Sequence, residues 1–99
     1  MWYTEHVKAP LPGDINIDVI GNIYFVYVTC QCNLSDEQIN GLRIGPITYL
    51  SRNGKNVTVG FDSIHEEYRD FSWAKTEAYR LLDALLNYHQ LPSFVTGVK

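Results

Sequence analysis

Residues 15–32 read Ile-Asn-Ile-Asp-Val-Ile-Gly-Asn-Ile-Tyr-Phe-Val-Tyr-Val-Thr-Cys-Gln-Cys. Two β-branched and aromatic runs flank Gly21-Asn22, which is typical of a two-residue hairpin turn because glycine takes a positive φ there at no steric cost. This turn pairs Val19 with Tyr24, Ile17 with Val26, and Ile15 with Val28. All six side chains then share one face, so the sequence predicts an antiparallel hairpin with one buried side. A single long strand bent at Gly21 is the alternative.

The other face of this hairpin mixes polar and aromatic residues. By the same alternation it holds Asn16, Asp18, Phe25, Tyr27 and Thr29. One helix covers only one face of a sheet, so we expect Phe25 and Tyr27 on a face that the core leaves uncovered. Exposed aromatic surface on a small domain commonly marks an interface, and the sequence therefore also predicts a homodimer or a higher oligomer.

A second hairpin is predicted over residues 44–61. Asn53-Gly54 separates two strand-like runs, and Asn-Gly is a strong short-range signal for a hairpin turn. With the turn at these two residues, the expected pairs are Leu50 with Val57, Thr48 with Val59, and Tyr49 with Thr58.

A long amphipathic helix is predicted over residues 71–90. Apolar residues recur there at helical spacing. Asp70 or Ser72 can cap its N-terminus, and Pro92 prevents the helix from continuing. The stripe comprises Ala74, Ala78, Leu81, Leu82, Leu85 and Tyr88, and its three leucines are expected among the most buried residues.

One or two helical turns are expected between the hairpins, within residues 33–41. Ser35 and Gln38 have the spacing of a capping box, and Gly41 suits the C-terminal end.

The order of elements predicts an α+β fold. The expected architecture is a two-layer sandwich: an antiparallel four-stranded sheet of two hairpins, with one long C-terminal helix on one face. Residues 1–99 are expected to form a single domain, because the chain has the length of one. Within it, residues 1–14 are expected to be an irregular N-terminal arm. Residues 93–99 are expected to be a C-terminal tail, with an edge strand through Phe94 and Val95 as the alternative.

Composition excludes several classes of protein. The chain is 45% hydrophobic and 19% charged, which is unlike a disordered tail. Its net charge is −3 and its eight lysines and arginines are dispersed, so nucleic acid is not expected as a direct ligand. No stretch approaches the ~18 apolar residues of a membrane span, and residues 1–8 lack the basic start and apolar run of a secretory signal, so none is expected. We expect a cytoplasmic protein that makes no membrane contact.

Residue patterns for chemistry are missing. Cys30 and Cys32 lack histidines at metal-ligand spacing, so they are expected to be reduced thiols without a metal. The sequence has no nucleophile motif and no glycine-rich phosphate loop. No catalytic residue and no cofactor are predicted, and an enzyme is the less favoured class.

The second hairpin and the helix, with Lys75-Thr76-Glu77-Ala78 early in the helix, resemble the end of a double-stranded-RNA-binding domain. The resemblance covers about half the chain. It implies a hairpin-and-helix fold, but the family's basic cluster is reduced to Lys75 among acidic residues. The resemblance therefore does not extend to RNA binding.

The remaining features favour a small protein-interaction module. Phe25 and Tyr27 would supply a desolvated anchor, since aromatic residues are enriched at interface cores. An acidic segment would steer the module toward a partner with a basic surface. That segment comprises Asp62, Glu66, Glu67 and Asp70.

One expectation of this class is an inhibitor, encoded by a phage or mobile element, that occludes a nucleic-acid-handling complex such as a bacterial defence system. The alternatives are a nucleic-acid-binding domain that stacks bases on the sheet, and a small oligomeric enzyme or ligand binder with a site between subunits.

Overall fold

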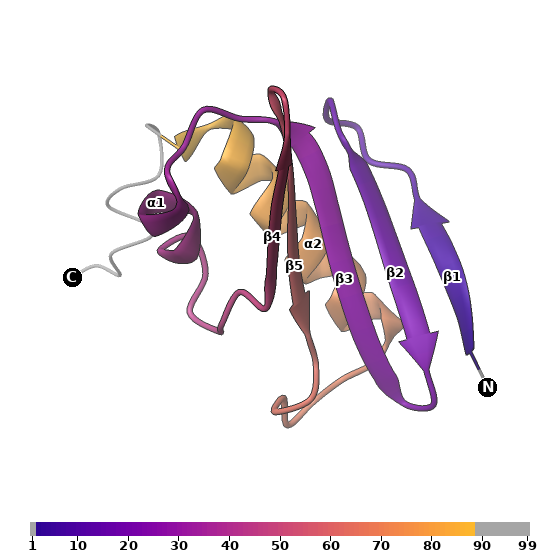
Figure 1. The fold of residues 1–99 in the computed structure, drawn as a ribbon. Helices are drawn as coiled ribbons and strands as arrows, with labels where there is room; N and C mark the ends of the chain where they lie inside the picture. Colours follow the sequence, from indigo (N-terminus) through magenta and orange to yellow (C-terminus); the bar gives the residue numbers. More distant parts are fainter. Residues whose placement is uncertain (1, 89–99) are drawn as a thin grey trace.

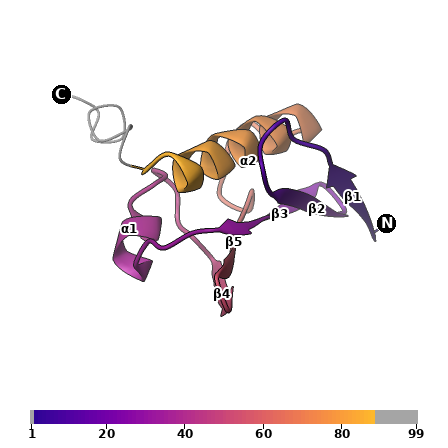
Figure 2. The ribbon, with the colours of Figure 1, turned by 90° about the horizontal axis from the view of Figure 1, so that it is seen from above.

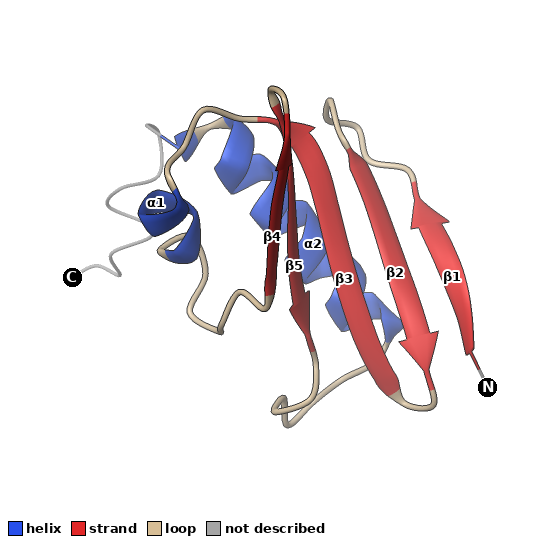
Figure 3. Ribbon diagram, in the orientation of Figure 1, coloured by secondary structure: helices blue, strands red, loops and turns tan. Residues whose placement is uncertain are grey.

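Five antiparallel strands and one long helix make up most of residues 2–88, the part of the chain that the computed structural model describes (Figure 1, Figure 3). The strands lie in the order β1-β2-β3-β5-β4. A short helix, α1, precedes β4, and the long helix, α2, crosses one face of the sheet (Figure 2). The elements are β1 (Trp2–Val7), β2 (Asp14–Ile20), β3 (Ile23–Gln31), α1 (Asp36–Asn40), β4 (Tyr49–Asn53), β5 (Asn56–Asp62) and α2 (Phe71–Leu86). The predicted α+β class with a helix on an antiparallel sheet is confirmed, but the sheet has five strands rather than four.

The first hairpin, β2–β3, has the predicted register. Val19 pairs with Tyr24, Ile17 with Val26, and Ile15 with Val28. Gly21 has a φ of +63° in the turn, so the alternative of one bent strand is wrong. The inward-facing valines and isoleucines of both strands are buried, which fixes the register because a one-residue slip would expose them.

The second hairpin, β4–β5, forms with a different register from the predicted one. Its turn is Gly54-Lys55, and Asn53 pairs with Asn56. Gly54 has a φ of +65°, so glycine takes the first central position of the turn, as Gly21 does. The predicted pairs were therefore wrong by two residues: Tyr49 pairs with Gly60, Leu50 with Val59, and Arg52 with Val57. A shift of two leaves every side chain on its predicted face, which is why the apolar pattern did not reveal it.

The segment expected to be an irregular arm contains the edge strand β1. It pairs with β2 through Tyr3–Val19, Glu5–Ile17 and Val7–Ile15. Val7 is its one buried residue among Trp2–Val7. An edge strand with little buried surface lacks the apolar alternation by which a strand is recognised, so the sequence pattern did not show it.

The core lies between α2 and the inward face of the sheet. Leu81, Leu82 and Leu85 are only 2%, 0% and 4% exposed, as predicted. The helix ends at Leu86 rather than residue 90, and the side chain of Asn87 donates to the Asp83 carbonyl. Tyr88 therefore lies outside the helix, and the predicted helix end at 89–90 and the predicted tail at 93–99 lie outside the described residues.

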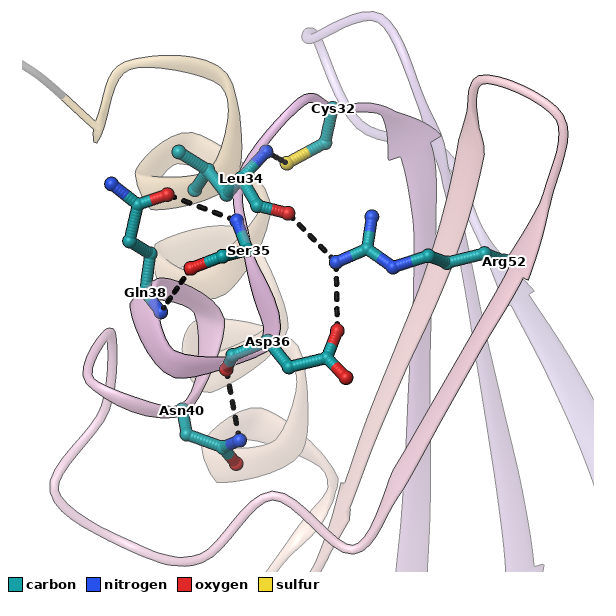
Figure 4. Close-up of polar contacts among 7 residues, drawn as sticks. All are labelled: Cys32, Leu34, Ser35, Asp36, Gln38, Asn40 and Arg52. Atoms are coloured by element: carbon teal, nitrogen blue, oxygen red, sulfur yellow. Dashed lines mark hydrogen bonds and ion pairs between the residues drawn. The ribbon is translucent and has the colours of Figure 1, made fainter.

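Hydrogen bonds and an ion pair from Arg52 connect the segment around helix α1 to β4 (Figure 4). The predicted capping box is present: the Gln38 N–H donates to Ser35 Oγ at 3.2 Å, and the Ser35 N–H donates to Gln38 Oε1 at 2.9 Å. Arg52 of β4 donates to the Leu34 carbonyl at 2.7 Å and to Asp36 Oδ1 at 2.8 Å. The β4 side of the sheet is thereby linked to the segment around α1.

Candidate interaction surface

The sheet has a second face that no described helix covers, which we call the open face. It is formed by the strand residues that point away from α2 (Figure 2). Its aromatic and acidic members are Trp2, Phe25, Tyr27, Tyr49, Asp14, Asp18 and Asp62. This surface contains two of the predicted anchor residues, Phe25 and Tyr27, and one of the predicted acids, Asp62.

An aromatic ring flanked by two carboxylates crosses this face. Asp18 of β2 lies directly opposite Phe25 of β3, and Phe25 lies opposite Asp62 of β5. The row is continued by Thr4 of β1, whose hydroxyl donates to Asp18 Oδ1 at 2.6 Å. Directly paired side chains on adjacent strands lie within about 5 Å at Cβ, so both carboxylates border the Phe25 ring.

The next row contains a pair of tyrosines. The rings of Tyr27 and Tyr49 lie edge to face, with centroids 5.6 Å apart and an interplanar angle of 86°. They come from β3 and β4, and Gly60 of β5 lies between them. A Cβ at Gly60 would approach Tyr27 Cδ1 and Tyr49 Cβ to 3.0 Å, so the missing side chain makes room for the pair.

Negative charge dominates the open face. Among the described strand residues that point to it, three are aspartates, Asp14, Asp18 and Asp62, and none is lysine or arginine. Burial, followed by the negative charge of Asp18, raises the pKa of Tyr27, with smaller contributions from Tyr49 and Asp62. The aromatic centre therefore lies in a negative potential, which favours a cationic ligand group.

The other predicted acids lie in the loop from β5 to α2, which we call the acidic loop (residues 63–70). This loop leaves the end of the sheet and crosses to the helix layer (Figure 1). Its start is held by Ser63, which is fully buried and accepts from the Tyr24 N–H at 2.9 Å. Glu66 is half-buried and Glu67 is exposed, and neither forms an ion pair with the described residues.

Asp70 has a structural role at the start of α2. Its Oδ1 accepts from the Trp73 N–H at 2.8 Å and its Oδ2 accepts from the Tyr68 hydroxyl at 2.6 Å. These two bonds hold the pKa of Asp70 below its usual value. Asp70 is thus the N-cap that the sequence predicted, and it lies apart from the strand residues of the open face.

Several surface residues were not identified from the sequence. Trp2 is 67% exposed and reaches the open face because β1 is a strand. Tyr49 joins Tyr27 through the observed register of the second hairpin. Tyr68, 70% exposed, adds an aromatic ring to the acidic loop. The alternation of β2 placed Asp18 on the same face as Phe25, but Asp18 was not among the predicted interaction residues.

The described part of the chain offers no cluster typical of a metal site. No group of three or more histidine, cysteine, aspartate or glutamate residues within it is placed to hold a metal ion. Two open hollows beside the end of α2 are lined by Cys30 and Cys32 respectively, and no histidine within residues 2–88 lines either. No helix within residues 2–88 is both long and apolar enough to cross a membrane.

Comparison with protein-family models, with curated proteins and with solved structures finds no match to this chain. The similarity to the end of a double-stranded-RNA-binding domain therefore rests on the order of the hairpin and helix alone. Inference about function depends on the surface itself.

Proposed function

We propose that this protein is a small, non-enzymatic interaction module that binds a basic protein surface through its open face. The observation that carries the proposal is the row Asp18–Phe25–Asp62, an aromatic ring between two carboxylates on an uncovered sheet. An aromatic face attracts a guanidinium or ammonium group, and carboxylates at its border supply charge-assisted hydrogen bonds. A partner surface that bears arginine could stack on the Phe25 ring and donate hydrogen bonds to the two carboxylates.

The acidic loop extends this surface in the proposal. Glu66 and Glu67 would act at the rim, where charge mainly raises the rate of association rather than the final affinity. Asp70 contributes to the same potential, although its carboxylate is already bonded within the protein.

The partner class that this chemistry favours is a nucleic-acid-handling complex. Such machines carry basic surfaces because they bind a polyanionic backbone. An acidic module seated on that surface would act as an inhibitor by occlusion, as for a phage-encoded or mobile-element-encoded protein directed at a bacterial defence system. Stacking of single-stranded nucleic acid on Phe25 and Tyr27 is the competing reading, and the three aspartates of the open face oppose it.

The test compares the wild type with three variants in capture and kinetics. Tyr27→Ala should abolish capture of the basic partner, and Glu66→Lys with Glu67→Lys should slow its association and flatten the salt dependence. Tyr88→Ala, at an exposed tyrosine beyond the end of α2, is the matched control and should bind as the wild type does. Circular dichroism verifies that each variant is folded.

Two results would overturn the proposal. One is a partner that Tyr27→Ala and the acidic-loop variant bind at wild-type rates. The other is binding of a single-stranded oligonucleotide that Tyr27→Ala removes, which would favour the stacking function.

A further inference from the structure

The free edge of β1 has the features of a strand that pairs with another chain. No described element lies beyond β1 in either ribbon view (Figure 1, Figure 2). Within Trp2–Val7 there is no proline, lysine or arginine, which are among the residues with which natural edge strands resist pairing, and the one carboxylate is that of Glu5. The other edge strand, β4, carries Arg52, which donates hydrogen bonds to Leu34 and Asp36 in the segment around α1.

The register determines which backbone groups of β1 are free. Ile20 and Ile23 close the two-residue turn of the first hairpin, so they form a hydrogen-bonded pair and the even-numbered residues of β2 face β3. The odd-numbered residues of β2 therefore face β1, where Val19 pairs with Tyr3 and Ile17 with Glu5. The N–H and C=O groups that β1 directs away from the sheet belong to Trp2, Thr4 and His6.

We propose that a second copy of this chain pairs with β1 in antiparallel fashion about a two-fold axis at Thr4. Paired residues on antiparallel strands share a face. The two-fold axis must therefore lie where a residue pairs with its own counterpart in the second copy, and not halfway between two successive residues of the strand. With the axis at Thr4, Thr4 lies opposite the second copy's Thr4, and Trp2 lies opposite the second copy's His6. Every outward-facing group of the strand then has a backbone partner.

The charges of β1 single out this register. An axis at Glu5 would place the two Glu5 carboxylates directly opposite each other, which is destabilising. An axis at Tyr3 would leave His6 without a partner inside the strand Trp2–Val7. With the axis at Thr4, Glu5 lies opposite the second copy's Tyr3, and Trp2, which is 67% exposed, packs beside an imidazole. The strand is thus complementary to itself in one register.

The pairing has a consequence for the surface of the assembly. The two-fold axis is perpendicular to the sheet, so both α2 helices lie on one side and both open faces on the other. The product is a continuous ten-stranded sheet, twice the five strands of one copy. This inference does not depend on the proposed function, although it would present two acidic aromatic surfaces side by side.

Light scattering on the full chain tests the association. We expect a mass of twice the 11.4 kDa monomer in the high micromolar range. Thr4→Pro removes the central outward N–H without touching the backbone bonds to β2, and should raise the dimer dissociation constant at least about tenfold. Thr4→Val is the matched control: it loses the same hydroxyl bond to Asp18 but keeps the N–H, and should remain dimeric.

Disulfide trapping tests the register independently of how Thr4→Pro folds. At a hydrogen-bonded pair the Cα atoms lie about 5.5 Å apart, within disulfide range, so Thr4→Cys in a Cys32→Ser background should cross-link two chains on mild oxidation. His6→Cys in the same background should not, because its two copies would lie roughly 14 Å apart along the strands. A monomeric wild type at high concentration, or equal cross-linking of both variants, would overturn the proposal.

Discussion

Gly60 controls how closely two tyrosines approach on the open face. Gly60→Ala would place a methyl group 3.0 Å from Tyr27 Cδ1 and from Tyr49 Cβ, so the two side chains must move apart. We expect a loss of about 1–3 kcal/mol in the free energy of unfolding, the usual cost of overpacking. Chemical denaturation measures it.

Gly41→Ala provides the matched control for this substitution. Its added Cβ would meet nothing closer than 3.6 Å, and its φ of −87° suits any residue. A Gly60→Ala protein as stable as Gly41→Ala would show that the tyrosine pair does not depend on the missing side chain.

Cys30 should make the free energy of unfolding depend on pH in the alkaline range. Burial, with a smaller effect of Cys32, raises the pKa of the Cys30 thiol from 9.0 to about 11. The unfolded chain therefore loses this proton first, so the contribution is complete below pH 9 and declines as pH rises toward 11. The slope reaches about 1.4 kcal/mol per pH unit.

Cys30→Ala should remove that part of the slope while leaving the contribution of the tyrosines. Denaturant unfolding of both proteins at about pH 8 and about pH 10 compares the two slopes. Identical slopes would contradict the assignment to Cys30.

At the scale of the element, α2 depends on its N-cap. Asp70→Ala removes the acceptor of the Trp73 N–H and leaves that donor without a partner, so the thermal midpoint should fall. Asp70→Asn retains a side-chain oxygen at the cap and removes only the charge, so it should melt near the wild type. If both variants melt alike, the carboxylate charge rather than the capping bond supports the helix.

The elements that could be predicted are those whose signal is local. The first hairpin and the leucine stripe of α2 follow from periodicity that burial enforces. The register of the second hairpin was not determined, because turns at 53–54 and 54–55 keep the same residues inside. β1 was missed because only Val7 of its inward-facing residues is buried, so Trp2–Val7 shows no apolar alternation.

The residues of the candidate site also fall into those that a local pattern predicts and those that long-range strand pairing places. Phe25 and Tyr27 were assigned to an uncovered face by alternation alone. The approach of Asp62 to Phe25 depends on the pairing of β3 with β5, strands far apart in the chain, so no local pattern contains it. Asp70 matched two local patterns, an acidic patch and a helix N-cap. The sequence could not choose between them, and the contacts of Asp70 are those of a cap.

At the scale of the whole molecule, the two faces of the sheet have different chemistry. The inward faces of β2, β3 and β5 are buried and almost entirely apolar beneath α2, whereas the open face combines aromatic rings with three aspartates. Helix α2, together with the buried Ile39 of α1 and Leu42 after it, completes the core on one face of the sheet. The open face is thereby left available for a ligand. The β1 edge is a separate surface, so recognition and self-association need not compete.

Self-association through β1 should make thermal stability depend on protein concentration. A partner that binds only the folded chain stabilises it by mass action, by about 2.7 kcal/mol at a hundred times the dissociation constant. In a domain of this size each kcal/mol raises Tm by roughly 4–8 °C, so calorimetry from about 10 μM to about 1 mM should show a rise of several degrees. Thr4→Pro should melt at one temperature throughout, and Thr4→Val should follow the wild type. A wild-type Tm independent of concentration would contradict pairing at β1, and an equal rise in Thr4→Pro would move the contact to another surface, with the open face the first to test.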